Sequence, residues 1–245
     1  MKRLLILLAL GISALGAGTI NIAVAANVSY AIEDLKQEFN KTHPDTKVRV
    51  TLGSSGKLTA QIKHGAPYDL FMSANMKYPQ ALYKEKIAIT EPKVYSLGSL
   101  ALISSKKRDF SKGINLLLDK EISKIAIANP KTAPYGIAAV QALRNVKIED
   151  AVKSKFVYGE SISQTLSYAL SAADIGIIAK SSLYSKKMSK YKENINWIAV
   201  DTKLYTPIKQ GIVMLKKDAE VKAFYDFILS ADAKKIFKNY GYSVQ

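Results

Sequence analysis

The sequence predicts an α/β protein with mostly parallel sheets and helices on both faces of each sheet. Strand-like and helix-like segments alternate almost throughout the chain, which is the pattern of such folds. No internal repeat, low-complexity tract or long Pro/Gly linker interrupts the alternation, so any division into lobes must come from chain crossings. Several predicted strands also end in loops of small and hydroxyl residues that open a helix, which is where α/β sheets bind ligands.

The N-terminal segment has the order of features found in secretory signal peptides. Lys2 and Arg3 precede the apolar run 4–10, and small residues follow up to residue 18. The apolar run is much shorter than the roughly 20 residues that a membrane-spanning helix requires. We expect residues 1–18 to be removed on export, which places the mature protein outside the cytoplasm.

The remaining chain divides into predicted strands and amphipathic helices. Short apolar or β-branched runs predict strands at 20–24, 48–52, 70–72, 100–103, 125–128, 156–158, 175–179, 198–200 and 212–215. Helices are predicted between them wherever apolar residues recur on one helical face. Such faces are formed by Ile32, Leu35 and Phe39; by Leu58 and Ile62; by Thr165, Leu166, Ala169 and Leu170; and by Val221, Phe224, Tyr225 and Ile228.

The composition excludes several kinds of chemistry, because cysteine is absent and only two histidines occur. Without cysteine the chain has no disulfide, no thiolate metal site and no cysteine nucleophile. His43 precedes Pro44 at a helix-to-strand turn, and His64 precedes a Gly-Ala-Pro sequence, so both are expected in solvated loops. We therefore expect no metal-cation site, no Ser-His-Asp triad and no cofactor.

The net charge of +16 raises the question of nucleic-acid binding. The basic residues are spread along the chain in short groups, such as 106–108, 186–187 and 216–217, without a long basic run or a basic stretch interleaved with aromatic residues. Nucleic acid is therefore not an expected partner. A diffuse positive potential favours the approach of small anions only weakly, because salt screens it.

Four strand-to-helix junctions share one character, being made of small or hydroxyl residues with almost no carboxylates. They are residues 24–30, 52–58, 129–139 and 158–166. Glu160 is the only carboxylate close to a helix start in these loops. Any one polar residue among them can be explained as an ordinary helix cap. Four such junctions in one exported chain predict a cleft built from neutral hydrogen-bond donors.

The junction LGSSGK at residues 52–57 resembles a phosphate-binding P-loop but departs from it at two positions. That motif needs a glycine where Thr51 stands and a Ser or Thr where Leu58 stands. Nucleotide binding is therefore disfavoured. A strand that leads small hydroxyl residues into a helix still predicts an anion site, because free N–H groups and the positive end of the helix dipole converge there.

Several segments together carry a resemblance to a known family. They are AIEDLKQEFNK, GSSGKLTAQIKHGAPYDLFMSAN, NPKTAPYGIAAVQAL and VKAFYDFILSADAKKIFKNYGYSV. From about Ile20 to the C terminus the chain is similar to the periplasmic molybdate-binding proteins of bacterial ABC importers. The resemblance implies a type II periplasmic binding protein fold, with two α/β lobes and a tetrahedral dianion enclosed between them. It implies one lobe from 19–97 with 208–245, a second lobe from 98–207, and crossings near 97–99 and 205–208.

The resemblance also implies which residues hold the anion. Ser55 matches a serine ligand of the family, and Asn27 stands where the family usually has another serine. We expect the amide N–H of the Asn27 side chain to donate in place of that hydroxyl. Tyr135 and Ile162 fall on positions where the family uses backbone N–H donors, which tolerate a change of side chain.

One expected contact is missing from the sequence. The tyrosine that completes the site in the family falls on Ala179, so its hydroxyl has no counterpart at this position. We expect Lys180, Ser163 or water to replace it, and Ser54 is a further candidate donor beside Ser55.

The function implied by the resemblance is capture, not catalysis. We expect a monomeric periplasmic protein that binds molybdate or tungstate and delivers it to the membrane permease of an ABC transporter. One alternative is a receptor of the same fold for sulfate, phosphate or ferric ion, although iron calls for carboxylates that the four junctions lack. Another is a secreted serine hydrolase using Ser55 or Ser163, for which neither histidine is placed to act as the base.

Overall fold

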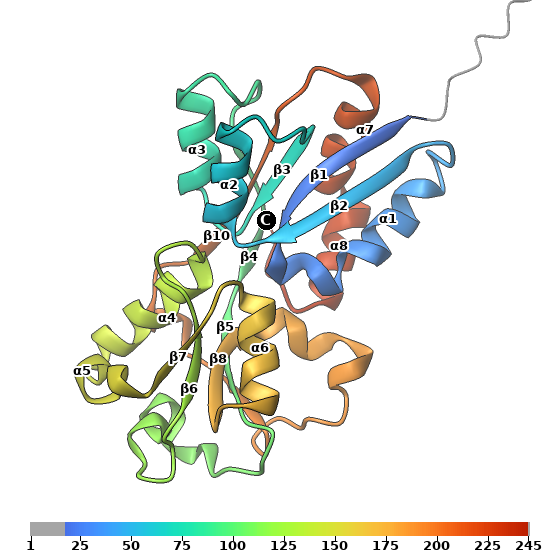
Figure 1. The fold of residues 1–245 in the computed structure, drawn as a ribbon. Coiled ribbons are helices and arrows are strands. Elements are labelled where there is room, and N and C mark those ends of the chain that lie inside the picture. Colours follow the sequence, from blue (N-terminus) through green and yellow to red (C-terminus); the bar gives the residue numbers. More distant parts are fainter. Residues whose placement is uncertain (1–17, 245) are drawn as a thin grey trace, which may run out of the picture.

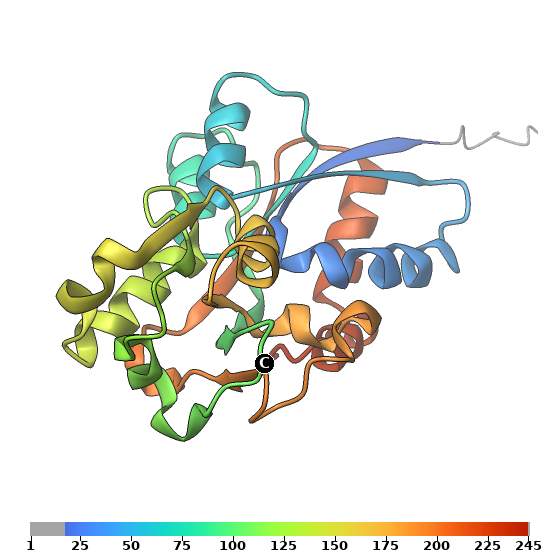
Figure 2. The same cartoon turned by 60° about the horizontal axis from the view of Figure 1, so that its bottom comes forward.

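The computed structural model describes residues 18–244 of the chain. These residues form two lobes, each a five-stranded sheet with helices packed on both faces (Figure 1). When the molecule is turned by 60° so that its bottom comes forward, the lower lobe of Figure 1 lies toward the viewer (Figure 2). The predicted signal peptide lies outside the described residues, apart from Gly18. In the described part of the chain, no helix is long and apolar enough to cross a membrane.

The first lobe is built on the sheet β2-β1-β3-β10-β4. Its strands are β1 (Thr19–Ala25), β2 (Lys47–Gly53), β3 (Leu70–Ser73), β4 (Lys93–Gly98) and β10 (Ile208–Met214). Its helices are α1 (Ile32–Asn40), α2 (Ser55–Lys63), α3 (Lys77–Lys84), α7 (Ala219–Leu229) and α8 (Ala231–Asn239). Apolar side chains of α1, α7 and α8 cover one face of the sheet, and those of α2 and α3 cover the other. The predicted helical faces thus lie in the core.

The second lobe is built on the sheet β7-β6-β8-β5-β9. Its strands are β5 (Leu100–Ile103), β6 (Ile125–Ala128), β7 (Phe156–Gly159), β8 (Ile175–Ala179) and β9 (Trp197–Ala199). Its α-helices are α4 (Pro134–Asn145), α5 (Glu149–Val152) and α6 (Ile162–Ser171). Ala138, Ala142 and Leu143 of α4 pack on one face of this sheet, whereas Leu166 and Ala169 of α6 pack on the other.

The chain passes twice between the lobes. Ser99 separates β4 of the first sheet from β5 of the second, and residues 200–207 lead from β9 back to β10. The two crossings touch, because the Leu100 N–H donates to the Tyr205 hydroxyl at 3.0 Å. The lobe boundaries predicted from the sequence stay a prediction, since the two sheets do not assign every connecting residue to a lobe.

Both sheets are mixed but mostly parallel, as predicted, because in each of them one strand runs against the other four. Strand β10 runs antiparallel to β3 and β4, and β5 runs antiparallel to β8 and β9. Every antiparallel pair contains a strand next to a crossing, where the chain enters or leaves a lobe in the opposite direction. Strand β4 and the first half of β10 were not predicted, because Lys, Ser, Gln and Gly interrupt their apolar residues.

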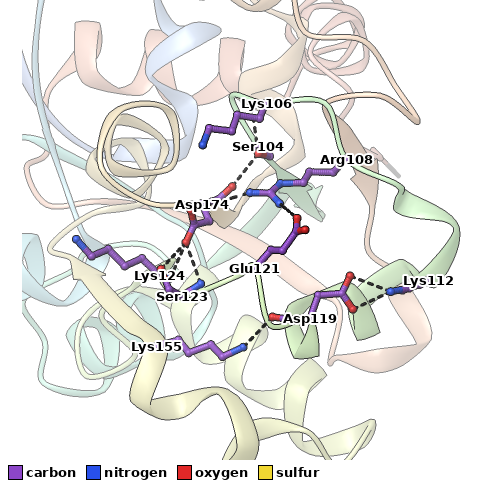
Figure 3. A network of polar contacts seen from close by, with 10 residues as sticks. All are labelled: Ser104, Lys106, Arg108, Lys112, Asp119, Glu121, Ser123, Lys124, Lys155 and Asp174. Carbon is purple, nitrogen blue, oxygen red and sulfur yellow. Dashed lines mark hydrogen bonds and ion pairs between the residues drawn. The ribbon is translucent and has the colours of Figure 1, made fainter.

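A polar network fastens the end of the second lobe that lies away from the carboxyl ends of its parallel strands (Figure 3). The Asp174 carboxylate, just before β8, accepts hydrogen bonds of 2.9 Å from the N–H and hydroxyl of Ser123 and from the Lys124 N–H. Partial burial alone would raise the pKa of Asp174, but these bonds and the nearby Arg108 guanidinium hold that pKa below its ordinary value. The network therefore joins the segments that precede β6 and β8. It lies at the end of the sheet opposite to the carboxyl ends of the parallel strands, where ligands bind in α/β sheets.

Candidate functional site

A small pocket lies between the lobes, where the four predicted junctions meet. Its cavity volume is about 10 Å³. Its lining residues come from both lobes and are Ala25, Ala26, Asn27, Gly53, Ser54, Ser55, Ala74, Ala133, Pro134, Tyr135 and Ile162. None of these described lining residues is charged. The pocket therefore presents neutral polar groups at the carboxyl ends of parallel strands, where α/β sheets bind ligands.

The lining residues lie there because each strand ends where a helix begins. Ser55 is the first residue of α2, Ile162 the first of α6, and Tyr135 follows Pro134 at the start of α4. Proline suits this first helical position, because its missing N–H would have no intrahelical acceptor. Gly136, two residues after Pro134, lets α4 approach β6 closely, since a Cβ there would lie only 2.1 Å from the Ala128 carbonyl oxygen.

Two serine hydroxyls are buried in the lining. Ser55 is fully buried, and its Oγ accepts a hydrogen bond of 2.9 Å from the Ala74 N–H. Because that bond uses a lone pair, the hydroxyl hydrogen of Ser55 remains available to a ligand. Ser54 is 4% exposed, and its Oγ has no hydrogen-bond partner among the described residues. A buried hydroxyl without a partner is costly, so the site is built to receive an acceptor.

Backbone N–H groups supply further donors at the helix starts. The first N–H groups of a helix have no intrahelical acceptor. Within residues 18–244, the N–H groups of Asn27, Ser55, Tyr135 and Ile162 donate to no other residue. All four residues line the pocket. Direct contact of each with a ligand stays a prediction, but the structure brings the four together from both lobes.

The expected role of the Asn27 side chain needs correction. Its Nδ2 donates to Gln210 Oε1 at 2.8 Å and to the Tyr242 hydroxyl at 2.9 Å. Both amide hydrogens are therefore used inside the protein, and the side chain cannot replace a serine hydroxyl toward a ligand. Any donor at this position must be the backbone N–H of Asn27, because the 3₁₀ helix Ala26–Tyr30 begins there.

Two of the proposed substitutes for the missing tyrosine lie outside the pocket lining. Ser163 Oγ donates to the Ala26 carbonyl at 2.8 Å and lies 3.3 Å from Ser29 Oγ, so it joins the two lobes. Lys180 is not among the lining residues, and its backbone N–H donates to the Ser99 carbonyl. The structure offers Ser54 as the additional hydroxyl at the pocket.

Direct contacts between the lobes surround the pocket, and the sequence analysis did not anticipate them. The Gly56 N–H of α2 donates to the Thr132 carbonyl of the other lobe at 2.9 Å. Beside it, the ammonium group of Lys57 forms an ion pair with the Glu160 carboxylate. The only carboxylate in the four junctions thus faces a lysine from the opposite lobe. The opposite charges of Lys57 and Glu160 were the one feature of the sequence from which this contact could have been predicted. The lobes are closed over the pocket.

Hydroxyl groups at and behind the pocket stay neutral near pH 7. Burial, with a smaller contribution from Tyr242, raises the pKa of Tyr135 well above its ordinary value. Burial likewise raises the pKa of Tyr242 to about 12. Since the described lining residues include no titratable acid or base of lower pKa, the pocket keeps one charge state across the neutral range.

Two α/β lobes closed over an uncharged, donor-lined pocket define a solute-binding protein of the type II periplasmic binding protein fold. The chain belongs to the family of bacterial extracellular solute-binding proteins, whose profile matches residues 20–243. It is 35% identical to the molybdate-binding protein ModA of Azotobacter vinelandii, covering 100% of this chain and 98% of that one. It is also 35% identical to ModA of Rhodobacter capsulatus, covering 92% and 88%.

The solved structures give the same result. The periplasmic molybdate-binding protein of Azotobacter vinelandii superposes with a TM-score of 0.84 at 29% identity, covering 92% of this chain and 99% of that one. This confirms the predicted two-lobed α/β class.

Breaking the interlobe ion pair should speed the release of a bound anion. We expect Lys57→Met or Glu160→Gln to raise the dissociation rate roughly two- to fivefold, because the pair is solvent-exposed and such pairs contribute modestly. Stopped-flow measurement of release checks this. The matched control is Lys63→Met, which removes an exposed ion pair with Glu85 that lies within the first lobe. If Lys57→Met and Lys63→Met change the dissociation rate equally, the Lys57–Glu160 pair does not help to hold the lobes closed.

Proposed function

We propose that this protein is a periplasmic receptor that binds molybdate in the interlobe pocket and delivers it to the membrane permease of an ABC transporter. The observation that carries the proposal is the uncharged pocket lined by N–H and O–H donors from both lobes. The two relatives at 35% identity that bear the name molybdate-binding protein support the choice of ligand.

The donor set suits a fully deprotonated dianion. Oriented N–H and O–H groups stabilise negative charge without a formal countercharge. The N-terminal ends of α2, α4 and α6 add the positive ends of their helix dipoles. No carboxylate is among the described lining residues to accept the proton of a protonated oxyanion. Molybdate and tungstate carry no proton near neutral pH, so both match this lining.

Size provides the discrimination among tetrahedral dianions. The donors of Ser55, Tyr135 and Ile162 are fixed by helix starts in two separate lobes. A smaller ion such as sulfate cannot reach all of them at about 2.7–3.0 Å. Tungstate has nearly the size of molybdate, so it should bind in the same way.

Delivery follows from closure of the lobes. Contacts such as Gly56 N–H to Thr132 carbonyl exist only when the lobes approach, so a ligand held by both lobes shifts the protein toward the closed form. The closed surface is what a permease recognises, and no bond needs to be made or broken. We propose that the exported protein acts as a monomer after removal of residues 1–18.

Neither histidine of the chain is placed to act as the base of the hydrolase alternative. His43 stacks on the Phe39 ring with centroids 4.4 Å apart, and His64 lies at the exposed C-terminal end of α2. Neither histidine is a lining residue. The alternative that remains to be separated by experiment is an oxyanion or ferric receptor of the same fold.

A thermal-shift panel tests the proposal. Molybdate and tungstate should raise the melting temperature strongly, because a tight ligand stabilises the folded state by mass action. Sulfate, phosphate and ferric citrate at the same concentration should raise it little, with sodium chloride as the ionic-strength control. A larger shift with sulfate, phosphate or ferric citrate than with molybdate would replace the proposed ligand.

A further inference from the structure

A buried polar cluster lies behind the pocket, centred on Gln210 of the returning strand β10. Gln210 is 0% exposed. Its Oε1 accepts hydrogen bonds of 2.8 Å from Asn27 Nδ2 and from the Tyr95 hydroxyl. Its Nε2 donates to the Tyr135 hydroxyl at 3.3 Å. One side chain thus contacts two lining residues, Asn27 of the first lobe and Tyr135 of the second.

The direction of these hydrogen bonds is fixed by a neighbouring residue. The Tyr242 hydroxyl donates to the Asn27 carbonyl at 2.8 Å, so toward the Asn27 side chain it can only accept. Asn27 must therefore present Nδ2 to Tyr242, and the same Nδ2 faces Gln210. Gln210 must therefore accept this bond with its Oε1, and its Nε2 is left to donate to the Tyr135 hydroxyl. Exchanging the oxygen and nitrogen of either the Asn27 or the Gln210 side-chain amide would place two donors or two acceptors against each other.

The cluster is enclosed by the crossing strands. Gly98, at the end of β4, passes so close that a Cβ there would lie 2.0 Å from the Tyr135 hydroxyl oxygen and 2.8 Å from Gln210 Nε2. Burial keeps the pKa of Tyr135 and that of Tyr95 well above the ordinary value, so both hydroxyls remain donors and acceptors at working pH. The bond from Gln210 to Tyr135 joins the two lobes beside the crossing strands.

We propose that Gln210 is a positioning residue of the anion site, which holds the Asn27 and Tyr135 sides of the pocket at a fixed separation in the closed form. The proposal rests on the proposed function and deepens it, because a fixed separation is what a size filter requires. Gln210 itself is not a lining residue of the pocket. It acts through the backbone positions of Asn27 and Tyr135, which line the pocket and whose N–H groups donate to no other described residue.

The test removes the interlobe hydroxyl alone. Tyr135→Phe keeps the backbone N–H and the aromatic ring but breaks the bond to Gln210. The matched control is Tyr205→Phe, which removes a buried hydroxyl from the crossing segment 200–207. That hydroxyl accepts a hydrogen bond from the Leu100 N–H and makes no hydrogen bond to the Gln210 cluster. Calorimetric titration with molybdate, competition with sulfate and the melting temperature without ligand are measured for both variants and the wild type.

We expect Tyr135→Phe to weaken molybdate binding roughly two- to tenfold, the effect of one neutral hydrogen bond, and to narrow the preference for molybdate over sulfate. Tyr205→Phe should lower the melting temperature and leave affinity and preference within about twofold. Gln210→Met should change the affinity for molybdate and the preference over sulfate in the same direction as Tyr135→Phe. If Gln210→Met does not fold, Tyr135→Phe still tests the proposal.

Two results would overturn the positioning role. One is a Tyr135→Phe protein with wild-type affinity and preference. The other is an equal loss of affinity in Tyr135→Phe and Tyr205→Phe, which would show general loosening of the crossing. In both cases the wild type still binds molybdate, so the proposed function stands. A wild type that binds no molybdate overturns the proposed function, and the positioning role falls with it.

Discussion

Gly56→Ala is expected to weaken molybdate binding about ten- to a hundredfold without destabilising the fold. A Cβ at this position would lie 2.9 Å from the Thr132 carbonyl oxygen and 3.0 Å from its Cα, which are backbone atoms of the opposite lobe. Overpacking of this kind costs about 1–3 kcal/mol, and here the cost falls only on the closed form. The Tyr78 hydroxyl, 2.7 Å away within the first lobe, ends a flexible side chain and can move aside.

The melting temperature separates this effect from misfolding. Alanine favours a helix over glycine by roughly 0.5–1 kcal/mol, so the ligand-free variant should be as stable as the wild type or slightly more stable. Calorimetric titration gives the affinity, and small-angle scattering should find the variant less compact than the wild type when molybdate is present. Wild-type affinity together with a wild-type radius of gyration would show that the lobes do not need this close approach.

Ser55→Ala is expected to weaken molybdate binding by a similar factor for a different reason. The change removes a hydroxyl hydrogen that has no acceptor among residues 18–244. A hydrogen bond to a charged group contributes about 1.5–3 kcal/mol, or about 10- to 150-fold in affinity. It also leaves the Ala74 N–H, now bonded to Ser55 Oγ, without its partner. A lower melting temperature should therefore accompany the loss of affinity.

Thr59→Val is the matched control for that variant. Thr59 is also buried in α2, and its hydroxyl donates to the Ser55 carbonyl at 2.7 Å, but it does not line the pocket. Its replacement should lower stability and leave the affinity within about twofold. If titration gives Ser55→Ala and Thr59→Val the same affinity, the Ser55 hydroxyl is not a ligand donor.

The fold was largely predictable, because its signal is apolar patterning. The faces of α1, α6 and α7 and the strands from β1 to β3 follow directly from the spacing of apolar residues. The crossing strands β4 and β10 could not be found in this way. In β4 the two buried residues, Tyr95 and Ser96, are adjacent and the flanking positions are exposed or half-buried, so no alternation marks a strand. In β10 the polar side chain of Gln210 is buried, where its polarity suggests a solvent-facing position.

The composition of the pocket was predictable, but the partners of its residues were not. The four junctions meet because the carboxyl ends of parallel strands share one edge of a sheet. The orientation of the Asn27 amide depends instead on Gln210 and Tyr242, which lie 183 and 215 residues away in the chain. Interlobe contacts such as Ser163 to Ala26 likewise depend on how the two sheets are placed relative to each other.

The central claim is a size-selective cage of neutral donors, and competition between molybdate and sulfate tests it most directly. Each donor that a smaller ion fails to reach costs about 1–3 kcal/mol, so two such losses approach a thousandfold in affinity. Protein saturated with molybdate is titrated calorimetrically with sulfate at constant ionic strength. The cage predicts that a hundredfold excess of sulfate leaves molybdate bound. Displacement of molybdate by a modest excess of sulfate would contradict the cage and identify the pocket as that of a sulfate receptor.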